Sequence, residues 1–321
     1  MSIEDKFDLK AGKTVHQASS EVQAPDKHQE GRRIIKDAAK LVQAHISKQP
    51  PVQRFFSFMP TMLTRVSPFH FKGKMKYTEW PLVRLDSGNA NSWGRMRVVG
   101  ELLIIFDETI LFALLALMTK FQSDAFETNQ EELCRLSDVQ PTSNTYNSIW
   151  QSIQRLAGTR IDLELFSGKG RRRKDLKEMT GSILSFADID RETGSIRIVV
   201  NPYFLEMYAD SFVTNIDLKF RSSLKSDVSK AFYRFYQGQY ESESDTEIAK
   251  LARAVNLETD LEMRRLKDKV RTGLKELQKR GYLKQYQITR DNRVIIEKSR
   301  DAAANYQSQI LDPSQIPYYS D

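Results

Sequence analysis

The sequence predicts an α+β fold in which one supersecondary unit occurs twice, preceded by a long N-terminal extension. Between residues 107 and 200, a helix, a short helix, a turn, a longer helix and several strand-like runs follow one another. The same order recurs between residues 227 and 298, although the two copies share almost no identical positions. Helix, short helix, helix and hairpin is the order of a winged helix-turn-helix. We therefore predict two tandem winged helix-turn-helix domains.

The segments outside the two copies differ in composition. Residues 1–31 contain few large apolar side chains, so we expect them to be largely disordered. A helix is predicted over 32–49, because its apolar residues recur at helical spacing and Pro50 and Pro51 end it. The predicted divisions are the extension 1–31, a helix with an aromatic and proline-rich segment over 32–94, the first winged helix over 95–215, the second over 216–300, and a tail over 301–321.

Capping residues and apolar spacing indicate the elements of the first copy. Asp107 can cap a helix that is apolar at nearly every position and is therefore expected to be buried. Thr128 and Glu131 are spaced as a capping box, and Gly158 is expected to end the longer helix. The expected elements are strands over 96–106, helices over 107–122, 128–139 and 145–157, and strands over 160–165, 182–190 and 195–200.

The second copy has the same order of elements. Its first helix is amphipathic and rich in aromatic residues, and its last hairpin is expected to turn at Asp291 and Asn292. The apolar residues Met263, Leu266 and Val270 begin a buried stripe along the long helix. The expected elements are helices over 225–240, 244–257 and 259–281, followed by a hairpin over 282–298.

A basic loop, "SGKGRRRK" at residues 167–174, separates two strand-like runs of the first copy. Because it follows the long helix, we interpret it as the wing of the first domain. Gly168 and Gly170 would let its tip bend closely onto a duplex. A charged hairpin tip is also typical of a solvated loop that only keeps a sheet soluble.

The outward faces of the two long helices carry side chains suited to DNA. The first presents mainly amides, which match base edges in the major groove and contribute roughly 1 to 3 kcal/mol per good bidentate contact. The second presents mainly cations, which suit phosphates as much as bases. Either face could alternatively be a solvated helix surface. The residues expected to contact DNA are Asn144, Asn147, Ser148, Gln151 and Arg155 on the first helix, Arg264, Arg265, Lys267, Lys269, Arg271, Thr272, Lys275 and Lys279 on the second, and Lys169, Arg171, Arg172, Arg173, Lys174, Arg290, Asn292 and Arg293 in the two hairpins.

The charge balance favours a polyanionic partner. The chain has 49 Lys or Arg against 42 Asp or Glu, a formal net charge of +7. From Asp260 to Arg300 there are thirteen Lys or Arg and six Asp or Glu, so the excess is concentrated in the second copy. Nucleic acid is the partner that such a segment indicates.

The residues that usually carry catalysis or bind metal are scarce. The four histidines, His16, His28, His45 and His70, all lie in the first 70 residues, ahead of the two predicted domains. The single cysteine, Cys134, lies in an apolar helical pattern and is expected to be buried. The loop "SGKGRRRK" lacks the spacing of a nucleotide-binding P-loop. We therefore expect no enzyme activity, no metal and no cofactor.

The longest apolar stretch does not predict a membrane span. The runs "VVGELLIIF" and "ILFALLALM" are interrupted by Gly100, Glu101, Asp107 and Glu108. The N-terminus has no basic segment followed by an apolar one. These features predict no membrane association and a cytoplasmic protein.

Two tandem winged helices in a basic chain resemble the plasmid replication initiators of the TrfA type, which bind iterons. The resemblance covers about residues 95–300 and is carried by "GELLIIFDETILFALLALMTKFQ", "NTYNSIWQSIQRLAGTRIDLEL", "FADIDRETGSIRIVVNPYFLEMYAD" and "LKSDVSKAFYRFYQGQ". It implies a bacterial protein that binds directly repeated origin sites, helps to open the origin and recruits host replication proteins such as helicase and initiator. It also implies a monomer–dimer equilibrium linked to plasmid copy control.

Some initiators of this type contact the host sliding clamp through a short peptide with glutamine and apolar residues. The segment "QRFFSF", Gln53 to Phe58, has the glutamine and an aromatic end, but phenylalanine where leucine is commoner. Its phenylalanines could instead belong to the core.

Two other functions use part of the same pattern. A plasmid or phage transcriptional repressor would also use winged helices, but it needs only one DNA-reading helix per subunit and a dimerisation domain. A nicking replication enzyme of the rolling-circle class requires a pair of metal-binding histidines one residue apart, and the sequence has no such pair. Two reading helices in one chain favour a long, asymmetric DNA site.

Overall fold

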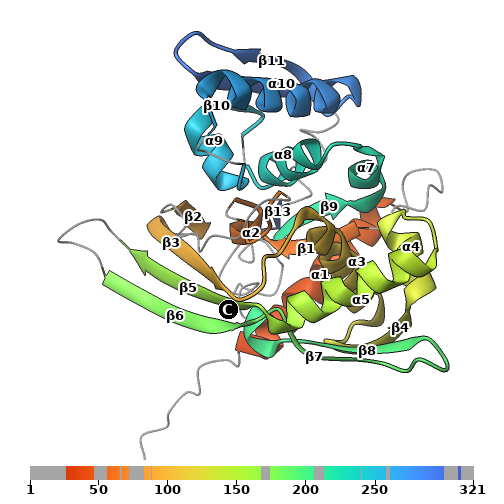
Figure 1. Cartoon of the computed structure of the whole chain (residues 1–321). Helices are drawn as coiled ribbons and strands as arrows, with labels where there is room; N and C mark the ends of the chain where they lie inside the picture. Colours follow the sequence, from red (N-terminus) through yellow and green to blue (C-terminus); the bar gives the residue numbers. More distant parts are fainter. Residues whose placement is uncertain are drawn as a thin grey trace, which may run out of the picture.

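The computed structural model contains two winged-helix units with the same topology, which confirms the predicted α+β fold with tandem winged helices (Figure 1). In each unit a three-stranded antiparallel sheet has its first strand beside its last, in the orders β4-β8-β7 and β10-β12-β11. No helix among the described residues is long and apolar enough to cross a membrane. The described residues are 27–46, 56–65, 67–71, 83–87, 89–167, 174–205, 213–239, 241–257, 261–299 and 310–311.

The first winged helix is built around the apolar helix α3, which is buried along most of its length. Its helix-turn-helix follows directly, and the aliphatic residues Ile149, Ile153 and Leu156 of the third helix are fully buried, as their spacing predicts. The elements are α3 (Ile105–Phe121), β4 (Ala125–Asn129), α4 (Gln130–Ser137), α5 (Ser143–Gly158), β7 (Leu184–Ile189) and β8 (Ser195–Val200).

Two predicted helix starts in this unit are wrong by one to three residues. Helix α3 has Ile104 as its N-cap, and the carboxylate of Asp107 accepts the backbone N–H of Ile104 at 2.8 Å from inside the first turn. Helix α4 is capped by Asn129, whose side chain accepts the N–H of Glu132 at 2.8 Å. Thr128 lies in β4 instead, because the cap is the last residue of that strand.

The second winged helix repeats this arrangement around α8, which is buried from Ala231 to Gln237. Helix α10 packs closely on α8, since a Cβ at Gly273 would lie 2.8 Å from Cγ1 of Val228. The predicted stripe of α10 is buried except for Met263, which is 38% exposed at the first helical position. The elements are α8 (Asp227–Gln237), β10 (Glu243–Glu247), α9 (Ile248–Ala254), α10 (Met263–Lys279), β11 (Leu283–Ile288) and β12 (Arg293–Lys298).

The strands that flank the arginine loop belong to a separate four-stranded sheet, so the interpretation of this loop as the first wing is wrong. Strand β5 pairs with β3, which precedes α3, and not with the strands of the winged helix. The hairpin β5–β6 is thus inserted between α5 and the true wing, β7–β8, and extends away from it in Figure 1. The sheet has the order β2-β3-β5-β6, with β2 (Val83–Ser87), β3 (Asn89–Val99), β5 (Arg160–Ser167) and β6 (Lys174–Ser182).

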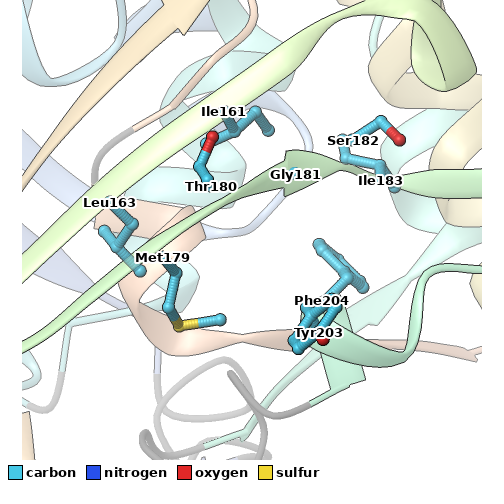
Figure 2. Close-up of a pocket in the computed structure, with 9 residues that line it drawn as sticks. All are labelled: Ile161, Leu163, Met179, Thr180, Gly181, Ser182, Ile183, Tyr203 and Phe204. Atoms are coloured by element: carbon cyan, nitrogen blue, oxygen red, sulfur yellow. The ribbon is translucent and has the colours of Figure 1, made fainter. Parts of the chain in front are cut away.

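The inserted hairpin rests on the helical residues 202–205 of the first unit. Figure 2 shows a small apolar pocket where Ile161 and Leu163 of β5 and Met179 of β6 lie near Tyr203 and Phe204. None of the residues that line this pocket is charged. We assign it to packing of the insertion and not to nucleic-acid binding.

A third sheet joins distant parts of the chain between the two units. Its order is β1-β9-β13, and the hydroxyl oxygens of Thr61 and Thr214 lie 2.7 Å apart beside it. Strand β13 therefore pairs with the strand that leads into the connection between the units. The elements are β1 (Phe56–Pro60), α2 (Thr61–Arg65), β9 (Val213–Asp217), α7 (Leu218–Ser223) and β13 (Ile310–Leu311).

The N-terminal helix α1 (Lys27–Ile46) begins earlier than predicted, so residues 27–31 of the supposedly disordered extension are helical. Gly31 explains how closely this helix packs on the first unit. A Cβ at this position would lie 2.3 Å from the carbonyl oxygen of Leu205, a contact that no side chain tolerates. Residues 1–26 lie outside the described part of the chain.

A lysine at the end of β12 is buried in the second unit. Lys298 is 3% exposed, and its ammonium donates to the backbone carbonyl of Gln239 at 2.9 Å. Burial lowers the pKa of Lys298 from 10.5 to about 7, while Glu241 raises this pKa and Arg65 lowers it. Because the folded pKa is depressed, the unfolded chain binds more protons between about pH 7 and 10.5. The free energy of unfolding therefore rises with pH through this range.

We predict that Lys298→Met makes the protein more stable below pH 7 and flattens its stability profile above that pH. One such group contributes a slope of at most about 1.4 kcal/mol per pH unit. Urea unfolding at several values between pH 6 and 9 measures this slope. Lys284→Met, which changes an exposed lysine on β11, is the matched control and should keep the wild-type slope. Equal slopes in wild type and Lys298→Met would contradict the assignment.

Candidate nucleic-acid interface

The third helices of the two winged-helix units, α5 and α10, occupy the recognition position of a helix-turn-helix. On α5, Asn144, Asn147 and Gln151 are exposed and Ser148 is half-buried, as predicted. The Ser148 hydroxyl donates to the carbonyl of Asn144 at 2.9 Å, so it is partly engaged within the helix. Because the three amides are exposed, their donor and acceptor groups can reach a partner.

The amide face of α5 borders the second unit. A groove runs between Asn144, Ser148 and Gln151 on one side and Asp227 and Lys230 of α8 on the other. Burial lowers the pKa of Lys230, and the nearby Arg221 guanidinium lowers it further. Lys230 was not among the predicted contacts, because its place beside α5 depends on the packing of two units that are separate in sequence. Any duplex on this face of α5 would pass close to the start of α8.

Arg155 is not available to DNA, contrary to the prediction. Its Nε and Nη2 donate to the carboxylate of Asp107 at 2.9 and 2.7 Å, and its side chain is 14% exposed. The same carboxylate accepts the hydroxyl of Ser152. Bidentate pairs of this kind fix the planar guanidinium in one orientation. Arg155 therefore positions α5 against α3 and is not a contact residue.

Helix α10 presents the basic surface that its sequence predicts. Arg271 pairs with Asp268 at 2.5 Å, but both side chains are more than half exposed, and such surface pairs contribute little. The Thr272 hydroxyl donates to the carbonyl of Asp268 at 2.9 Å. The exposed predicted residues are Arg264, Arg265, Arg271, Thr272, Lys275 and Lys279, while Lys267 and Lys269 are half-buried.

The wing of the second unit is the hairpin β11–β12, as predicted. Arg290 is exposed in its turn, and Arg293 donates to Asp245 of β10 at 2.8 Å. Asn292 has a φ of 64°, a left-handed conformation that asparagine adopts more readily than most residues. Its carbonyl accepts the N–H of Ile248 at 2.9 Å, which ties the wing to the start of α9. Asn292 thus shapes the wing through its backbone.

The wing of the first unit is the hairpin β7–β8, which sequence analysis did not select. Its turn is closed by the carboxylate of Asp190, which accepts the N–H groups of Glu192 and Thr193 at 2.8 and 3.3 Å. Gly194 has a φ of 71°, and Arg191 is exposed at the tip. The turn "DRETG" between two alternating runs indicated this hairpin. The wing was assigned to the neighbouring arginine loop because that loop is more basic.

The remaining predicted contacts lie in or beside the arginine loop. Lys169, Arg171, Arg172 and Arg173 lie outside the described residues, and Lys174 is the first residue of β6. Strands β5 and β6, which flank the loop in sequence, belong to the four-stranded sheet and not to the wing. Their contact with DNA stays a prediction.

The structure does not favour the proposed clamp-binding peptide. Phe58 is 2% exposed in β1, so the aromatic end of Gln53 to Phe58 belongs to the core. Gln53 to Phe55 lie outside the described residues. A buried phenylalanine cannot enter a partner's pocket without unfolding this strand.

His70 precedes the two winged-helix units in the sequence, as predicted, but its backbone pairs with Ile104 at the start of α3. His70 donates its backbone N–H to Leu103 at 2.8 Å, and its carbonyl accepts the N–H of Ile105 at 3.1 Å. Burial lowers the pKa of His70 to about 4, so it is neutral at pH 7. The described residues contain no cluster of three or more groups that could hold a metal ion.

Residues 98–237, from β3 to the end of α8, match the protein family described as "Initiator Replication protein, WH1". The matched segment is similar to the first winged helix of replication initiators. It contains the whole first winged helix, the inserted hairpin and the start of the second unit. The predicted resemblance to replication initiators is confirmed for this part of the chain.

The fold is also similar to solved structures. A crystal structure of domains 2 and 3 of RctB has 14% sequence identity and a TM-score of 0.51, and the match covers 74% of this chain and 98% of that one. A second crystal structure of the same RctB domains has 12% identity and a TM-score of 0.49, with 77% and 99% coverage. No curated protein sequence matches the chain. At 14% identity, the first of these likenesses shows the fold alone.

We predict different effects for substitutions on the two recognition helices. Asn147→Ala or Gln151→Ala should reduce the ratio of specific to non-specific affinity, because amides match base edges. Lys275→Ala should weaken binding to all sequences alike, because lysine mainly contacts phosphate. Affinities for a DNA site that footprinting shows to be protected, and for unrelated DNA, separate these outcomes when measured by fluorescence anisotropy. Lys120→Ala, at the end of α3, is the control cation. If all three variants lowered both affinities by the same factor, the assignment of α5 to base contacts would be wrong.

Proposed function

We propose that this protein is a plasmid replication initiator that binds double-stranded origin DNA with both winged helices. The observation that carries the proposal is the presence of two recognition helices, at equivalent positions of two equivalent units, in one chain. Winged-helix repressors need one such helix per subunit. Two in a single chain suit a long, asymmetric site, such as each copy of a directly repeated iteron.

The two helices have complementary chemistry for such a site. Helix α10, with its exposed cations, suits phosphate contacts that give affinity. Helix α5, with its exposed amides, suits base contacts that give sequence discrimination. The wing tips add one exposed arginine each, Arg191 and Arg290. The division of roles therefore follows the division between the two units.

Further steps of initiation are part of the proposal. Binding to repeated sites would help to open a neighbouring segment of the origin and would bring host replication proteins to it. Dimers would compete with the monomers that act in initiation. We propose no catalytic role for the chain.

Footprinting on DNA that flanks the protein's own gene tests this function. We expect several equally spaced protected sites of about two helical turns each, since each winged helix covers part of one site. Binding should weaken steeply with salt, with a slope of about −0.9 in log–log units per phosphate neutralised. Supercoiled DNA carrying the sites should stay supercoiled with Mg²⁺ present.

Three results would count against the proposal. A single palindromic footprint would indicate a repressor, and an open-circle product would indicate a nicking enzyme. Affinity that does not change between low and moderate salt would exclude the phosphate contacts assigned to α10.

A further inference from the structure

We propose that a buried cluster of one carboxylate and two guanidinium groups, Glu108 with Arg221 and Arg234, sets the separation and orientation of the two recognition helices. The consequence for DNA, which rests on the proposed function, is that the protein discriminates sites by the spacing between their two halves. The cluster is distinct from the residues expected to contact DNA.

The cluster joins three parts of the chain. Glu108 is in the first turn of α3 and belongs to the first unit, Arg221 is in the connecting helix α7, and Arg234 is in α8 of the second unit. Nη2 of Arg221 lies 2.5 Å from Oε2 of Glu108, and Nη1 of Arg234 donates to Oε1. The three side chains are 0 to 2% exposed. A single carboxylate therefore holds both the connector and the second unit.

Each guanidinium is also held from a second direction. Nη1 of Arg221 donates to the hydroxyl of Thr109 at 2.8 Å, and its guanidinium lies 5.0 Å from the ring centre of Phe112. Nε of Arg234 donates to the carbonyl of Thr64 in α2 at 3.4 Å. A planar group bound along two edges has little freedom to rotate. The pairs thus define angles as well as distances.

Directional bonds continue from this cluster to both recognition helices. Asp107, next to Glu108, holds Arg155 of α5, as described above. On the other side, the Glu276 carboxylate of α10 accepts the N–H of Lys225 at 2.6 Å and the hydroxyl of Ser229 in α8 at 2.6 Å. The path from α5 to α10 therefore runs through α3 and α8 and crosses between the units at Glu108.

A charged cluster of this kind resists small displacements. Apolar contacts are non-directional, and a core tolerates some sliding when volume is conserved. A buried charge that loses its partner is strongly unfavourable, so the two units have one relative placement in which Glu108 pairs with both arginines. On B-DNA, each inserted base pair moves one half-site along and around the duplex axis. A recognition helix at a fixed distance and angle from its partner can then no longer contact both half-sites.

The test replaces the cluster without leaving a buried charge unpaired. The triple variant Glu108→Leu, Arg221→Met, Arg234→Met keeps similar volumes, and such exchanges commonly preserve folding. The matched control, Arg97→Met with Asp162→Leu, removes an exposed ion pair between β3 and β5 within one sheet. Arg221→Lys is the milder variant, because it keeps the positive charge but loses the planar guanidinium that bonds in two directions. Melting curves establish that each variant is folded.

The first measurement needs no DNA. Spin labels at Gln154→Cys on α5 and Lys279→Cys on α10, in a Cys134→Ala background, report the distance between the recognition helices. We expect one narrow distribution in wild type and in the control, a broad one in the triple variant, and intermediate width in Arg221→Lys. An equally narrow distribution in wild type and both cluster variants would overturn the proposal.

The second measurement uses a duplex carrying one protected site, with one or two base pairs inserted between its halves. We expect the insertion to weaken wild-type binding by at least about tenfold, comparable to a mismatched base pair, and the triple variant to lose much less. An equal penalty in both would refute the role in spacing. A wild-type protein with the narrow distance and no specific DNA binding would instead refute the proposed function alone.

Discussion

The structure depends on two adjacent carboxylates at the start of α3. Asp107 and Glu108 are both fully buried, and each binds arginine from a different direction, Asp107 from α5 and Glu108 from α7 and α8. Burying a carboxylate is costly unless it is paired and hydrogen-bonded. Helices α5, α7 and α8 must therefore be placed so that their arginines reach these two carboxylates. The first turn of a single helix thus serves as the common reference for both winged-helix units.

This arrangement explains why the two winged-helix units are packed together and are not independent domains. Helix α8 serves as the first helix of the second unit and also contacts α3 and α2 of the preceding part. At its end, a Cβ on Gly238 would lie 1.8 Å from Oγ1 of Thr64, so the approach of α2 requires glycine there. Recognition helices α5 and α10 would therefore keep a fixed relative position when they contact a duplex.

Much of the fold could be predicted from local sequence patterns. The apolar spacing of Ile149, Ile153 and Leu156 correctly predicted the buried face of α5, and the same pattern predicted α10. The turn at Asp291 and Asn292 correctly predicted the second wing. These features depend on residues close together in the chain, for which helical and strand periodicity is informative.

The errors arose where the partner is distant in sequence. Alternation in residues 160–165 indicated a strand but could not show that its partner is β3, so the arginine loop was assigned to the wrong hairpin. Arg155 lies on the same helical side as Gln151, but its partner, Asp107, is 48 residues away. The role of Glu108 could not be inferred at all, since its partners lie 113 and 126 residues further along the chain. In each case tertiary packing selected among options that the local pattern left open.

The central claim is that both recognition helices engage one DNA site at a fixed separation. Affinity cleavage tests it most directly, with iron–EDTA attached at Gln154→Cys on α5 or at Asp268→Cys on α10, two exposed positions outside the predicted contacts, in a Cys134→Ala background. The account predicts two cleavage centres on the same site, one for each attachment point, with the same separation at every copy of the site. Cleavage near the site from only one attachment point, or a separation that varies between copies, would contradict it.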